Sequence, residues 1–277
     1  MSETIKCGVI GHPISHSKSP LIHNYWIKTY NLDGSYEAID IAPEELKTGV
    51  ERLIDEGYKG FNVTIPHKEA IMELCDSVDH NAQAIGAVNT VLIEDGKLRG
   101  MNTDGFGFLN NIWDFDPEFE FEDKNVVVLG AGGAARAIIS GLIGEMVAHV
   151  HLLNRTREKA EKIQDEMSFT SDLIQVHNWE NSSQILNKAD LLVNTTSLGM
   201  EGHPPLDIDI SDLPGEALVN DIVYAPLETE LLKKANMRGN IAITGIGMLI
   251  HQARPAFKEW FGLLPDVTDE LKELVLK

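Results

Sequence analysis

Val126-Val-Val-Leu-Gly-Ala-Gly-Gly-Ala-Ala-Arg136 is the stretch from which the fold of this 277-residue chain can be worked out. Its apolar run, with no polar alternation, predicts a strand buried on both faces of a parallel sheet. The turn that follows fits the pattern G-x-G-x-x-A, and residues 134–144 have the composition of a helix. In that order Gly130 permits a tight turn, Gly132 lets the backbone approach a pyrophosphate, and Ala135 allows close helix packing. We predict a dinucleotide-binding unit, with a tight turn of another kind of α/β protein as the alternative.

The charge of the chain excludes one class of partner. Asp and Glu number 43 against 23 Lys and Arg, which gives a formal net charge of −20. Non-specific nucleic-acid binding requires a positive surface, so we expect no nucleic-acid partner. If the ligands are anionic, the few Lys and Arg residues near the site must overcome a repulsive field.

The remaining composition is typical of a soluble enzyme. No run of about eighteen apolar residues is present, so we expect no membrane span. Cys7 and Cys75 lie far apart and the chain shows no signal peptide, which favours a reducing cytoplasm. His149 and His151 would share one side of a strand, but no Cys or carboxylate completes a ligand set, and we expect no metal. A homodimer is compatible with the sequence.

Strand and helix alternate through the first half of the chain, which predicts a mainly parallel sheet there as well. The expected strands cover residues 5–11, 36–41, 60–66, 85–93 and 97–102, and the expected helices cover 21–30, 43–56 and a stretch after Glu69. In such sheets ligands bind beyond the carboxyl ends of the strands. Polar side chains stand near these ends, and we expect them to converge on a hydroxylated ligand: Asn62, Thr64, Lys68, Asn89, Thr90 and Asp104.

Two serines lie in the loop after the first expected strand. Ser17 and Ser19 are two residues apart, with Lys18 between them and Pro20 after them. Their hydroxyls could face one polar ligand, or the loop could cap the following helix, with Pro20 in its first turn. The residues alone leave both interpretations open.

A set of motifs runs along nearly the whole chain. In the first half these are His16-Ser-Lys-Ser-Pro20, Asn62-Val-Thr-Ile-Pro-His-Lys68, Gly86-Ala-Val-Asn-Thr90 and Asn102-Thr-Asp-Gly105. In the second half they are Gly130-Ala-Gly-Gly-Ala134, Asn154-Arg-Thr156, Asn194-Thr-Thr-Ser-Leu-Gly-Met200, Asp221-Ile-Val-Tyr224 and Gly247-Met-Leu-Ile-His-Gln252. In content and in order, the set resembles the shikimate dehydrogenase family.

The resemblance implies an NADP-dependent, reversible reduction of 3-dehydroshikimate to shikimate, in the pathway to chorismate and the aromatic amino acids. It also implies that Lys68 and Asp104 form the catalytic pair. The chemistry agrees, because reduction of a ketone needs a proton for the developing alkoxide, and an ammonium can supply it. The substrate-binding positions of the family correspond here to Ser17, Ser19, Asn62, Thr64, Lys68, Asn89, Asp104, Tyr224 and Gln252.

The cofactor positions implied by the resemblance surround the glycine-rich turn. They are Gly130, Ala131, Gly132, Gly133, Ala134, Asn154, Arg155, Thr156, Thr195, Thr196, Ser197, Met200, Ile222, Gly245 and Met248. NAD-binding folds usually carry Asp or Glu about 20 residues beyond the glycines, but Asn154 and Arg155 stand there. A guanidinium suits a 2′-phosphate, so we expect NADP rather than NAD. Many members carry a second arginine where this chain has Lys159, and Arg157 could substitute for it.

The second half continues as a Rossmann-type unit. We expect strands over 147–153, 189–194, 217–223 and 241–245, a surface excursion over 201–215 and a helix from Gly247. By analogy with the family, that last helical section returns to the first domain. The resemblance thus implies a substrate-binding domain of residues 1–104 and 247–277, an NADP-binding domain of residues 105–246, and an active cleft between them.

Two other functions stay open. A quinate or dual quinate/shikimate dehydrogenase is the nearer one, although Ser17 and Ser19 favour shikimate, because quinate-using relatives tend to carry a threonine at the second position. A non-catalytic NADP-binding sensor is the alternative from a different class, and the presence of both Lys68 and Asp104 argues against it.

Overall fold

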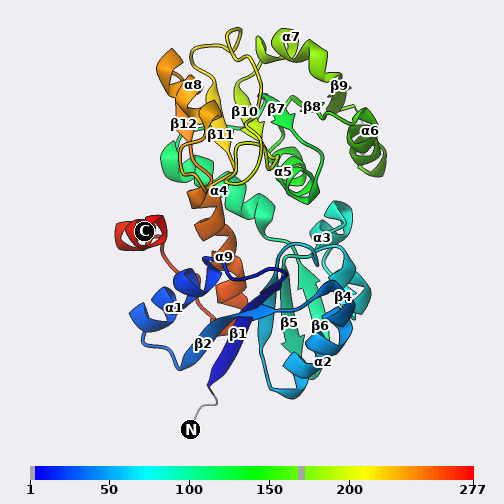
Figure 1. Ribbon diagram of the computed structural model, residues 1–277, viewed down its shortest axis with the longest axis vertical. Coiled ribbons are helices and arrows are strands. Elements are labelled where there is room, and N and C mark those ends of the chain that lie inside the picture. Colours follow the sequence, from blue (N-terminus) through cyan, green and yellow to red (C-terminus); the bar gives the residue numbers. More distant parts are fainter. Residues whose placement is uncertain (1–3, 168–171) are drawn as a thin grey trace. The chain divides into compact units, whose positions relative to one another are not determined.

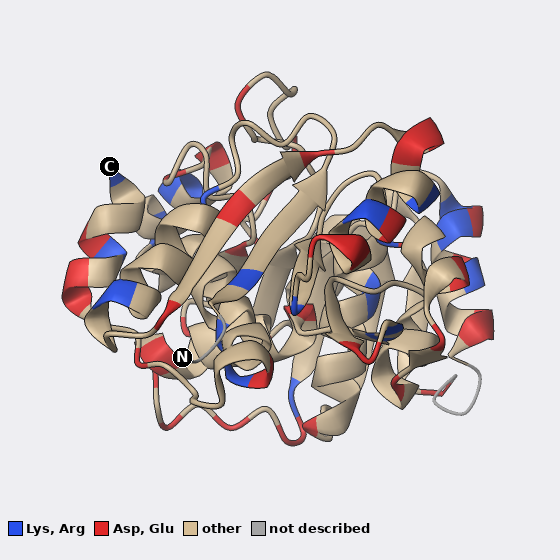
Figure 2. Cartoon of the chain, turned by 90° about the horizontal axis from the view of Figure 1, so that it is seen from below, with Lys and Arg blue, Asp and Glu red and all other residues tan. Residues whose placement is uncertain are grey.

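The computed structural model describes residues 4–167 and 172–277, which form alternating strands and helices (Figure 1). Figure 2 shows Asp and Glu spread over helices and connecting loops, consistent with 43 acidic against 23 basic residues. Within the described residues, no helix is both long and apolar enough to cross a membrane.

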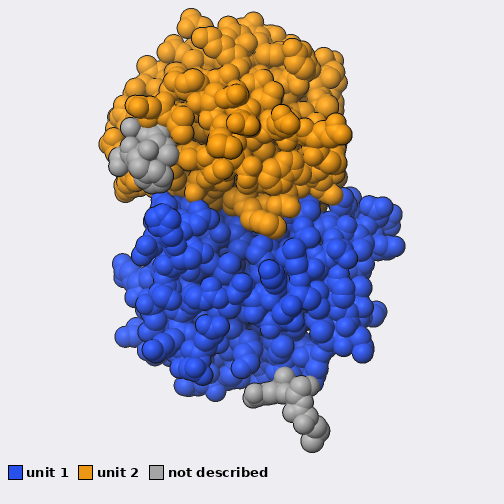
Figure 3. Space-filling view, turned by 180° about the vertical axis from the view of Figure 1, so that it is seen from behind, with its two compact units in different colours: residues 1–104, 250–277 blue, residues 105–249 orange. Residues whose placement is uncertain are grey.

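The chain divides into two compact units, coloured separately in Figure 3. Unit 1 comprises residues 1–104 and 250–277, and unit 2 comprises residues 105–249. The chain leaves unit 1 at the start of α4 (Asp104–Phe115) and returns within α9 (Ile246–Phe261). The boundary between unit 2 and the last part of unit 1 thus lies inside α9 and not before it, because Met248 in the first turn of α9 packs in the core of unit 2.

Unit 1 is built on a six-stranded sheet in the order β2-β1-β3-β5-β6-β4 (Figure 1). Its strands are β1 (Ile5–Gly11), β2 (Gly34–Asp40), β3 (Gly60–Val63), β4 (Ser77–Val78), β5 (Thr90–Glu94) and β6 (Lys97–Met101). The pairs β1–β2, β1–β3 and β4–β6 are parallel, and β5 runs antiparallel to β3 and β6. The expected, mainly parallel sheet is confirmed. The exception is β5, because the tight turn at Asp95 and Gly96 folds β6 directly back on it.

Helices surround the sheet of unit 1 and bury its apolar side chains. They are α1 (Ser19–Thr29), α2 (Leu46–Asp55), α3 (His80–Ile85), most of α9, α10 (Asp269–Leu276) and the 3₁₀ turns η1 (Pro43–Glu45) and η2 (Ala70–Leu74). The last helix, α10, packs on α1. Val50 and Leu53 of α2 belong to the same buried cluster as Ile10, Phe61 and Val91 of the sheet. This packing holds the strand ends that carry the polar motifs.

Two expectations for unit 1 are wrong. Ile85 ends helix α3 and does not begin a strand, because the Asp79 side chain caps the start of that helix and Gly86, at φ 73°, ends it in the left-handed conformation. The chain after Glu69 forms one 3₁₀ turn and no full helix. It is pulled back to the sheet at Asp76, whose side chain accepts from the Leu98 N–H and whose own N–H donates to the Leu98 carbonyl.

Unit 2 contains a six-stranded, all-parallel sheet in the order β12-β11-β10-β7-β8-β9. Its strands are β7 (Asn125–Leu129), β8 (His149–Leu153), β9 (Ile174–His177), β10 (Leu191–Asn194), β11 (Leu218–Asp221) and β12 (Ala242–Ile243). The order places the first strand in the middle and reverses direction beside it, as in Rossmann-type folds. The predicted Rossmann-type unit is confirmed.

Helices cover both faces of this sheet. They are α4, α5 (Gly133–Gly144), α6 (Arg157–Glu166), α7 (Ser182–Leu186), which follows the 3₁₀ turn η4 (Trp179–Asn181), and α8 (Glu230–Arg238). Val126 and Val128 of β7 pack in the core with α4, α5 and α6, while Val127 and Leu129 pack in the core with α7 and α8. The central strand is therefore buried on both faces, as its unbroken apolar run predicts.

The segment 201–215 is only in part the surface excursion expected from its Pro and Asp content, because residues 201–205 are exposed but the rest packs on the core through its apolar side chains. Leu206, Ile208 and Ile210 are buried in the core beside α8, while Asp207 and Asp209 between them are exposed. Because apolar and polar residues alternate, one side of this segment packs on the core of unit 2, although the segment forms no strand.

Candidate active site

The centre of the candidate site is the pair Lys68 and Asp104 of unit 1. Lys68 lies in the turn after β3, where its carbonyl accepts from the Val88 N–H at 2.8 Å, and Asp104 begins α4 just beyond β6. The Lys68 ammonium donates to Asp104 Oδ2 at 2.6 Å. The Lys68 side chain is 27% exposed and that of Asp104 9%. The amine is thus partly accessible, while its carboxylate partner is buried.

Asn89 connects this pair to the neighbouring elements of unit 1. Its Nδ2 donates to Asp104 Oδ1 at 2.8 Å and to Thr103 Oγ1 at 3.0 Å, and its Oδ1 accepts from the Thr103 N–H at 2.9 Å. Nδ2 also lies 3.5 Å from Gln252 Oε1, and Thr103 Oγ1 donates to the Gln252 carbonyl at 2.8 Å. Both carboxylate oxygens of Asp104 therefore have a donor, which a buried charge requires.

Asn62 lies within β3 and Thr64 lies just beyond the end of the strand, and the two differ in exposure. The buried Asn62 side chain is fully engaged inside unit 1: Nδ2 donates to Thr90 Oγ1 and the Asn89 carbonyl, and Oδ1 accepts from the Tyr36 hydroxyl. Thr64 is partly exposed, and its N–H donates to the Ile10 carbonyl at 3.0 Å. Of the two, Thr64 has the side chain that a ligand of unit 1 reaches more directly.

Ser17 and Ser19 lie at the start of α1. Ser19 is the first residue of the helix and its N–H lies 3.3 Å from Ser17 Oγ, while Lys18 occupies the N-cap position without a side-chain cap. Pro20 is in the first turn. The loop begins the helix, and Ser17 stays partly exposed. Both interpretations of the serine pair are therefore compatible with this geometry.

Tyr224 belongs to unit 2, where it follows β11. Burial raises the pKa of its hydroxyl above the ordinary value, so the group is a neutral donor at physiological pH. Gln252 belongs to unit 1. Five of the predicted substrate residues form one group connected by hydrogen bonds: Lys68, Asn62, Asn89, Asp104 and Gln252.

The glycine-rich turn of unit 2 has the backbone that its sequence predicts. Gly130 ends β7 at φ 106°, and a Cβ there would lie 2.8 Å from Thr195 Oγ1. The turn is therefore tight against the loop that follows β10. Around Gly132 and Gly133 the protein leaves open space, with no atom within 4 Å of an added Cβ. Small residues there are not demanded by packing within unit 2, and they suit close approach of a pyrophosphate.

Helix α5 begins in this open space. Gly132 is its N-cap residue and offers no side chain to bond the first N–H groups of the 12-residue helix. Those N–H groups and the positive end of the helix dipole suit a phosphate. The donor set therefore fits a dinucleotide, the group that the sequence motif predicts.

The residues predicted to distinguish NADP from NAD lie at the tip of β8. Arg155 and Thr156 are exposed, and Asn154 Nδ2 donates to the Thr156 carbonyl at 2.7 Å, which closes the turn before α6. Arg157 is already engaged, because Nε donates to Glu161 and a terminal nitrogen donates to Asn178, both at 2.7 Å. Arg155 is thus the guanidinium with the freer access to a 2′-phosphate.

The remaining predicted cofactor residues lie beyond β10, β11 and β12. Thr195 Oγ1 donates to the Leu129 carbonyl at 2.7 Å, and Thr196 Oγ1 donates to Asn194 Oδ1 at 2.7 Å, so these hydroxyls shape the loop. Ser197 and Met200 are exposed. An added Cβ on Gly245 would collide with the Ile222 carbonyl, so a larger residue at position 245 would force those two loops apart.

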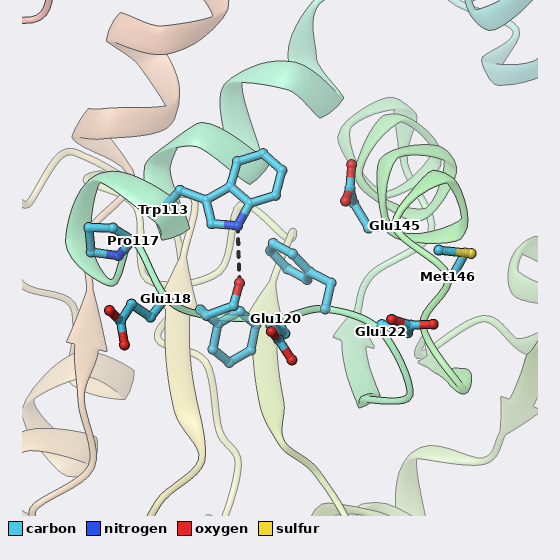
Figure 4. Close-up of a pocket in the computed structure, with 9 residues that line it drawn as sticks. Trp113, Pro117, Glu118, Glu120, Glu122, Glu145 and Met146 are labelled. Carbon is cyan, nitrogen blue, oxygen red and sulfur yellow. Dashed lines mark hydrogen bonds between the residues drawn. The ribbon is translucent and has the colours of Figure 1, made fainter.

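The cavity drawn in Figure 4 is separate from these residues. It has a volume of about 580 Å³ and lies in unit 2. Its lining includes Trp113, whose Nε1 donates to the Phe119 carbonyl, and the side chains of Glu118, Glu120, Glu122 and Glu145. It contains none of the predicted site residues, and its carboxylates would repel an anionic ligand. It is not the candidate active site.

Comparison with known sequences supports the motif analysis. Residues 9–91 match the family model described as "Shikimate dehydrogenase substrate binding domain", residues 115–200 match "Shikimate / quinate 5-dehydrogenase", and residues 245–275 match "Shikimate 5'-dehydrogenase C-terminal domain". The chain is 49% identical over 267 residues to the shikimate dehydrogenase (NADP(+)) of Methylocella silvestris, covering 96% of this chain and 94% of that protein. It is 45% identical over 270 residues to that of Paramagnetospirillum magneticum, covering 97% of each.

Solved structures extend the likeness to the fold. The Aquifex aeolicus shikimate dehydrogenase is 39% identical and covers 100% of this chain and 99% of its own, with a TM-score of 0.89. The Thermus thermophilus enzyme in complex with NADP(H) and shikimate is 35% identical over 98% of each chain, with a TM-score of 0.87. The Corynebacterium glutamicum quinate dehydrogenase in complex with NAD is 32% identical over 99% of each chain, with a TM-score of 0.90.

These likenesses, with the Rossmann-type sheet and its glycine turn, define an NADP-dependent oxidoreductase. The chain belongs to the shikimate dehydrogenase family. The resemblance inferred from the motifs is confirmed.

Sequence reasoning left out several residues that hold the site together. Thr103 joins Asn89 to Gln252, and Asn102 Oδ1 accepts the Asp104 N–H at 3.0 Å. Both stand in the Asn102-Thr-Asp-Gly105 motif, so the signal was present. Tyr36 contacts Asn62 from a strand distant in sequence, and nothing local in its sequence marks it.

Proposed function

We propose that this protein catalyses the reversible, NADP-dependent reduction of 3-dehydroshikimate to shikimate, with unit 1 holding the substrate and unit 2 holding NADP. The observation that carries the proposal is the ion pair between the partly exposed Lys68 ammonium and the buried Asp104 carboxylate at 2.6 Å. In a chain of formal net charge −20, a cation held at the ends of strands is well suited to a carbonyl oxygen that becomes negative.

Lys68 is the general acid and base of this reaction. NADPH, when bound, supplies the hydride that adds to the carbonyl carbon. Lys68 Nζ donates its proton to the carbonyl oxygen as the C–O π bond becomes an alkoxide, which yields the hydroxyl of shikimate. In the reverse direction the neutral amine takes that proton back. Asp104 Oδ2 accepts from Lys68 throughout and keeps Nζ in place, while Asn89 holds Asp104 Oδ1.

The rest of the substrate would be bound by the other polar residues of the predicted set. We assign the ring hydroxyls to Lys68, Asn89, Asp104 and Gln252, which already contact one another. The hydroxyls of Ser17, Ser19 and Tyr224 suit the carboxylate, because each can donate one hydrogen bond. Thr64 adds a further partly exposed hydroxyl, and Asn62 contributes by fixing its neighbours.

The cofactor would be bound by backbone and by one guanidinium. The N–H groups at the start of α5 suit the pyrophosphate, and the open space at Gly132 and Gly133 lets it come close. Arg155 and Thr156 suit the 2′-phosphate. We assign the nicotinamide end to the loops that carry Thr195, Thr196, Ser197, Met200, Ile222, Gly245 and Met248.

A matrix of two substrates against two cofactors tests the proposal. Steady-state oxidation of shikimate and of quinate, each with NADP and with NAD, should be fastest for shikimate with NADP. Faster oxidation of quinate would make the protein a quinate dehydrogenase. NADP binding with no turnover of either acid would make it a sensor. A homodimer and a cytoplasmic location stay predictions, open to analytical ultracentrifugation and cell fractionation.

A further inference from the structure

A tyrosine outside the assigned site lies at the start of a hydrogen-bond chain that ends on the catalytic carboxylate. Tyr36 is in β2, is 3% exposed, and donates its hydroxyl proton to Asn62 Oδ1 at 2.6 Å. Asn62 Nδ2 donates to Thr90 Oγ1 at 2.9 Å, and Thr90 Oγ1 donates to Asn89 Oδ1 at 3.0 Å. Asn89 Nδ2 then donates to Asp104 Oδ1 at 2.8 Å.

All of these donors point the same way. Each amide or hydroxyl accepts from the residue before it and donates to the next, and the last acceptor is the carboxylate that Lys68 contacts from its other oxygen. Aligned hydrogen bonds polarise one another, and the effect is larger where water is excluded. The side chains joined by these hydrogen bonds are all buried: Tyr36, Asn62, Thr90, Asn89 and Asp104. Lys68, which contacts the last of them, is partly exposed.

We propose that Tyr36 is a positioning residue of the active site, whose hydroxyl fixes the Asn62 amide and thereby the donor chain that holds Asp104 and Lys68. The inference rests on the function proposed above. Among the described residues, Tyr36 makes no hydrogen bond to Lys68 or Asp104, so it acts on them through the amides of Asn62 and Asn89.

Contacts to its backbone and to its ring fix the position of Tyr36. Its backbone N–H and C=O are both bonded by the Asn24 side chain of α1, at 3.2 and 2.7 Å. The His23 ring stacks on the Tyr36 ring with centroids 4.0 Å apart and planes 1° from parallel. Burial lowers the pKa of His23 to about 3, with the neighbouring Asn62 side chain offsetting this in part, so the ring stays neutral.

The two ends of the Asn62 amide explain why one hydroxyl matters. The nitrogen end is held twice, by Thr90 Oγ1 and by the Asn89 carbonyl, while the oxygen end is held by Tyr36. Without that hydroxyl the buried oxygen loses its donor, and the amide is free to tilt toward another one. Thr90 then loses the donor that sets the direction of its own hydroxyl.

The test is Tyr36→Phe, with Tyr25→Phe as the matched control. Tyr25 is in α1, also in unit 1, and its hydroxyl bonds Thr268 Oγ1 at 2.7 Å, away from the donor chain. We expect kcat for shikimate oxidation to fall about tenfold in Tyr36→Phe, with KM changed less, and to stay within about twofold in the control. Combining Tyr36→Phe with Asn62→Ala should cost no more than Asn62→Ala alone.

A second measurement separates this inference from the proposed function. The rate at which a small acylating reagent modifies Lys68, followed by mass spectrometry, should rise several-fold in Tyr36→Phe and not in Tyr25→Phe. That result in a protein that oxidises no shikimate would remove the proposed function and keep the positioning role. Equal kcat and equal Lys68 acylation in the two variants would refute the role of Tyr36, as would losses that multiply in the double variant.

Discussion

Asp104 of unit 1 and Asp221 of unit 2 are both buried carboxylates at the end of a strand, but they are paired differently. Asp104 contacts the Lys68 ammonium and the Asn89 amide. Asp221, which is 0% exposed, accepts from Asn194 Nδ2, the Val223 N–H and Thr229 Oγ1 at 2.9, 3.0 and 2.6 Å, and makes no salt bridge within the described residues.

The partners indicate what each carboxylate can do. Neutral donors satisfy Asp221 without giving it access to a proton or a ligand, so it serves to fold the loop that carries Ile222 and Tyr224. Burial raises the pKa of Asp221, and its three donors offset only part of that rise. Asp104 is paired with the Lys68 ammonium, which is itself partly exposed. A ligand could therefore contact Lys68 while Asp104 holds the ammonium in place. This difference is the basis for proposing a catalytic role for Asp104 and a structural role for Asp221.

Of the substitutions considered, removing Lys68 should have the largest effect on activity, because it breaks the ion pair with Asp104. In Lys68→Ala, kcat should fall by about a thousandfold or more, because the alkoxide loses both its cation and its proton donor, while shikimate still binds. Stopped-flow turnover and isothermal titration calorimetry measure the two quantities. Lys97→Ala removes an exposed lysine of the same unit and should leave kcat unchanged. A Lys68→Ala rate close to wild type would exclude lysine from the mechanism.

Removing Asp221 should instead destabilise the fold. Asp221→Ala leaves the Val223 N–H and the Thr229 hydroxyl buried without an acceptor, which should lower the free energy of unfolding by about 3 kcal/mol. The exposed Asp209, which accepts from the Ser211 N–H, provides the control, and Asp209→Ala should change the free energy of unfolding far less. Calorimetry at fixed pH measures both. If Asp221→Ala were as stable as the control, the carboxylate would have no structural role.

Local patterns predicted most of the fold and of the site. An unbroken apolar run identified β7, and a glycine turn with a helix after it identified the dinucleotide unit, because each depends on residues adjacent in sequence. The motif around Lys68 and the motif ending at Asp104 were found in the same way. Their contact at 2.6 Å depends on pairing β3 with β5 and β5 with β6, which motifs alone do not determine.

Features set by distant contacts were missed. Apolar residues from Ile85 onward predict a strand, but the Asp79 cap and Gly86 end a short helix there. Residues 206–210 alternate like a strand, yet they pack on α8 without pairing to one. The role proposed for Tyr36 depends on its contact with Asn62, which is 26 residues away and on the strand beyond β1. No periodic pattern in the sequence predicts that contact.

Replacing Arg155 tests whether unit 2 recognises its cofactor by side chain as well as by backbone. Arg155→Ala should raise KM for NADPH roughly 30-fold and leave KM for NADH nearly unchanged, because a charge-assisted bond to a 2′-phosphate is lost. Arg157→Ala is the control, since that guanidinium is engaged by Glu161 and Asn178 and should contribute little. A larger effect at Arg157 than at Arg155 would exchange the two assignments.

The smallest expected effect concerns a buried histidine of unit 2. Burial, helped by His177, His149 and Lys188, lowers the pKa of His151 to about 4, and His151 Nδ1 lies 3.0 Å from His177 Nε2. The unfolded chain therefore binds more protons than the folded one between about pH 4 and 6.5, so stability present above pH 6.5 is lost as the pH falls through this window.

His151→Gln should reduce that acid-induced loss of stability by about 1–2 kcal/mol, measured as melting temperatures at pH 6.5 and 4.5. His203→Gln, at an exposed histidine of the same unit, should follow the wild-type curve. Parallel curves for all three proteins would show that His151 takes up its proton equally in both states.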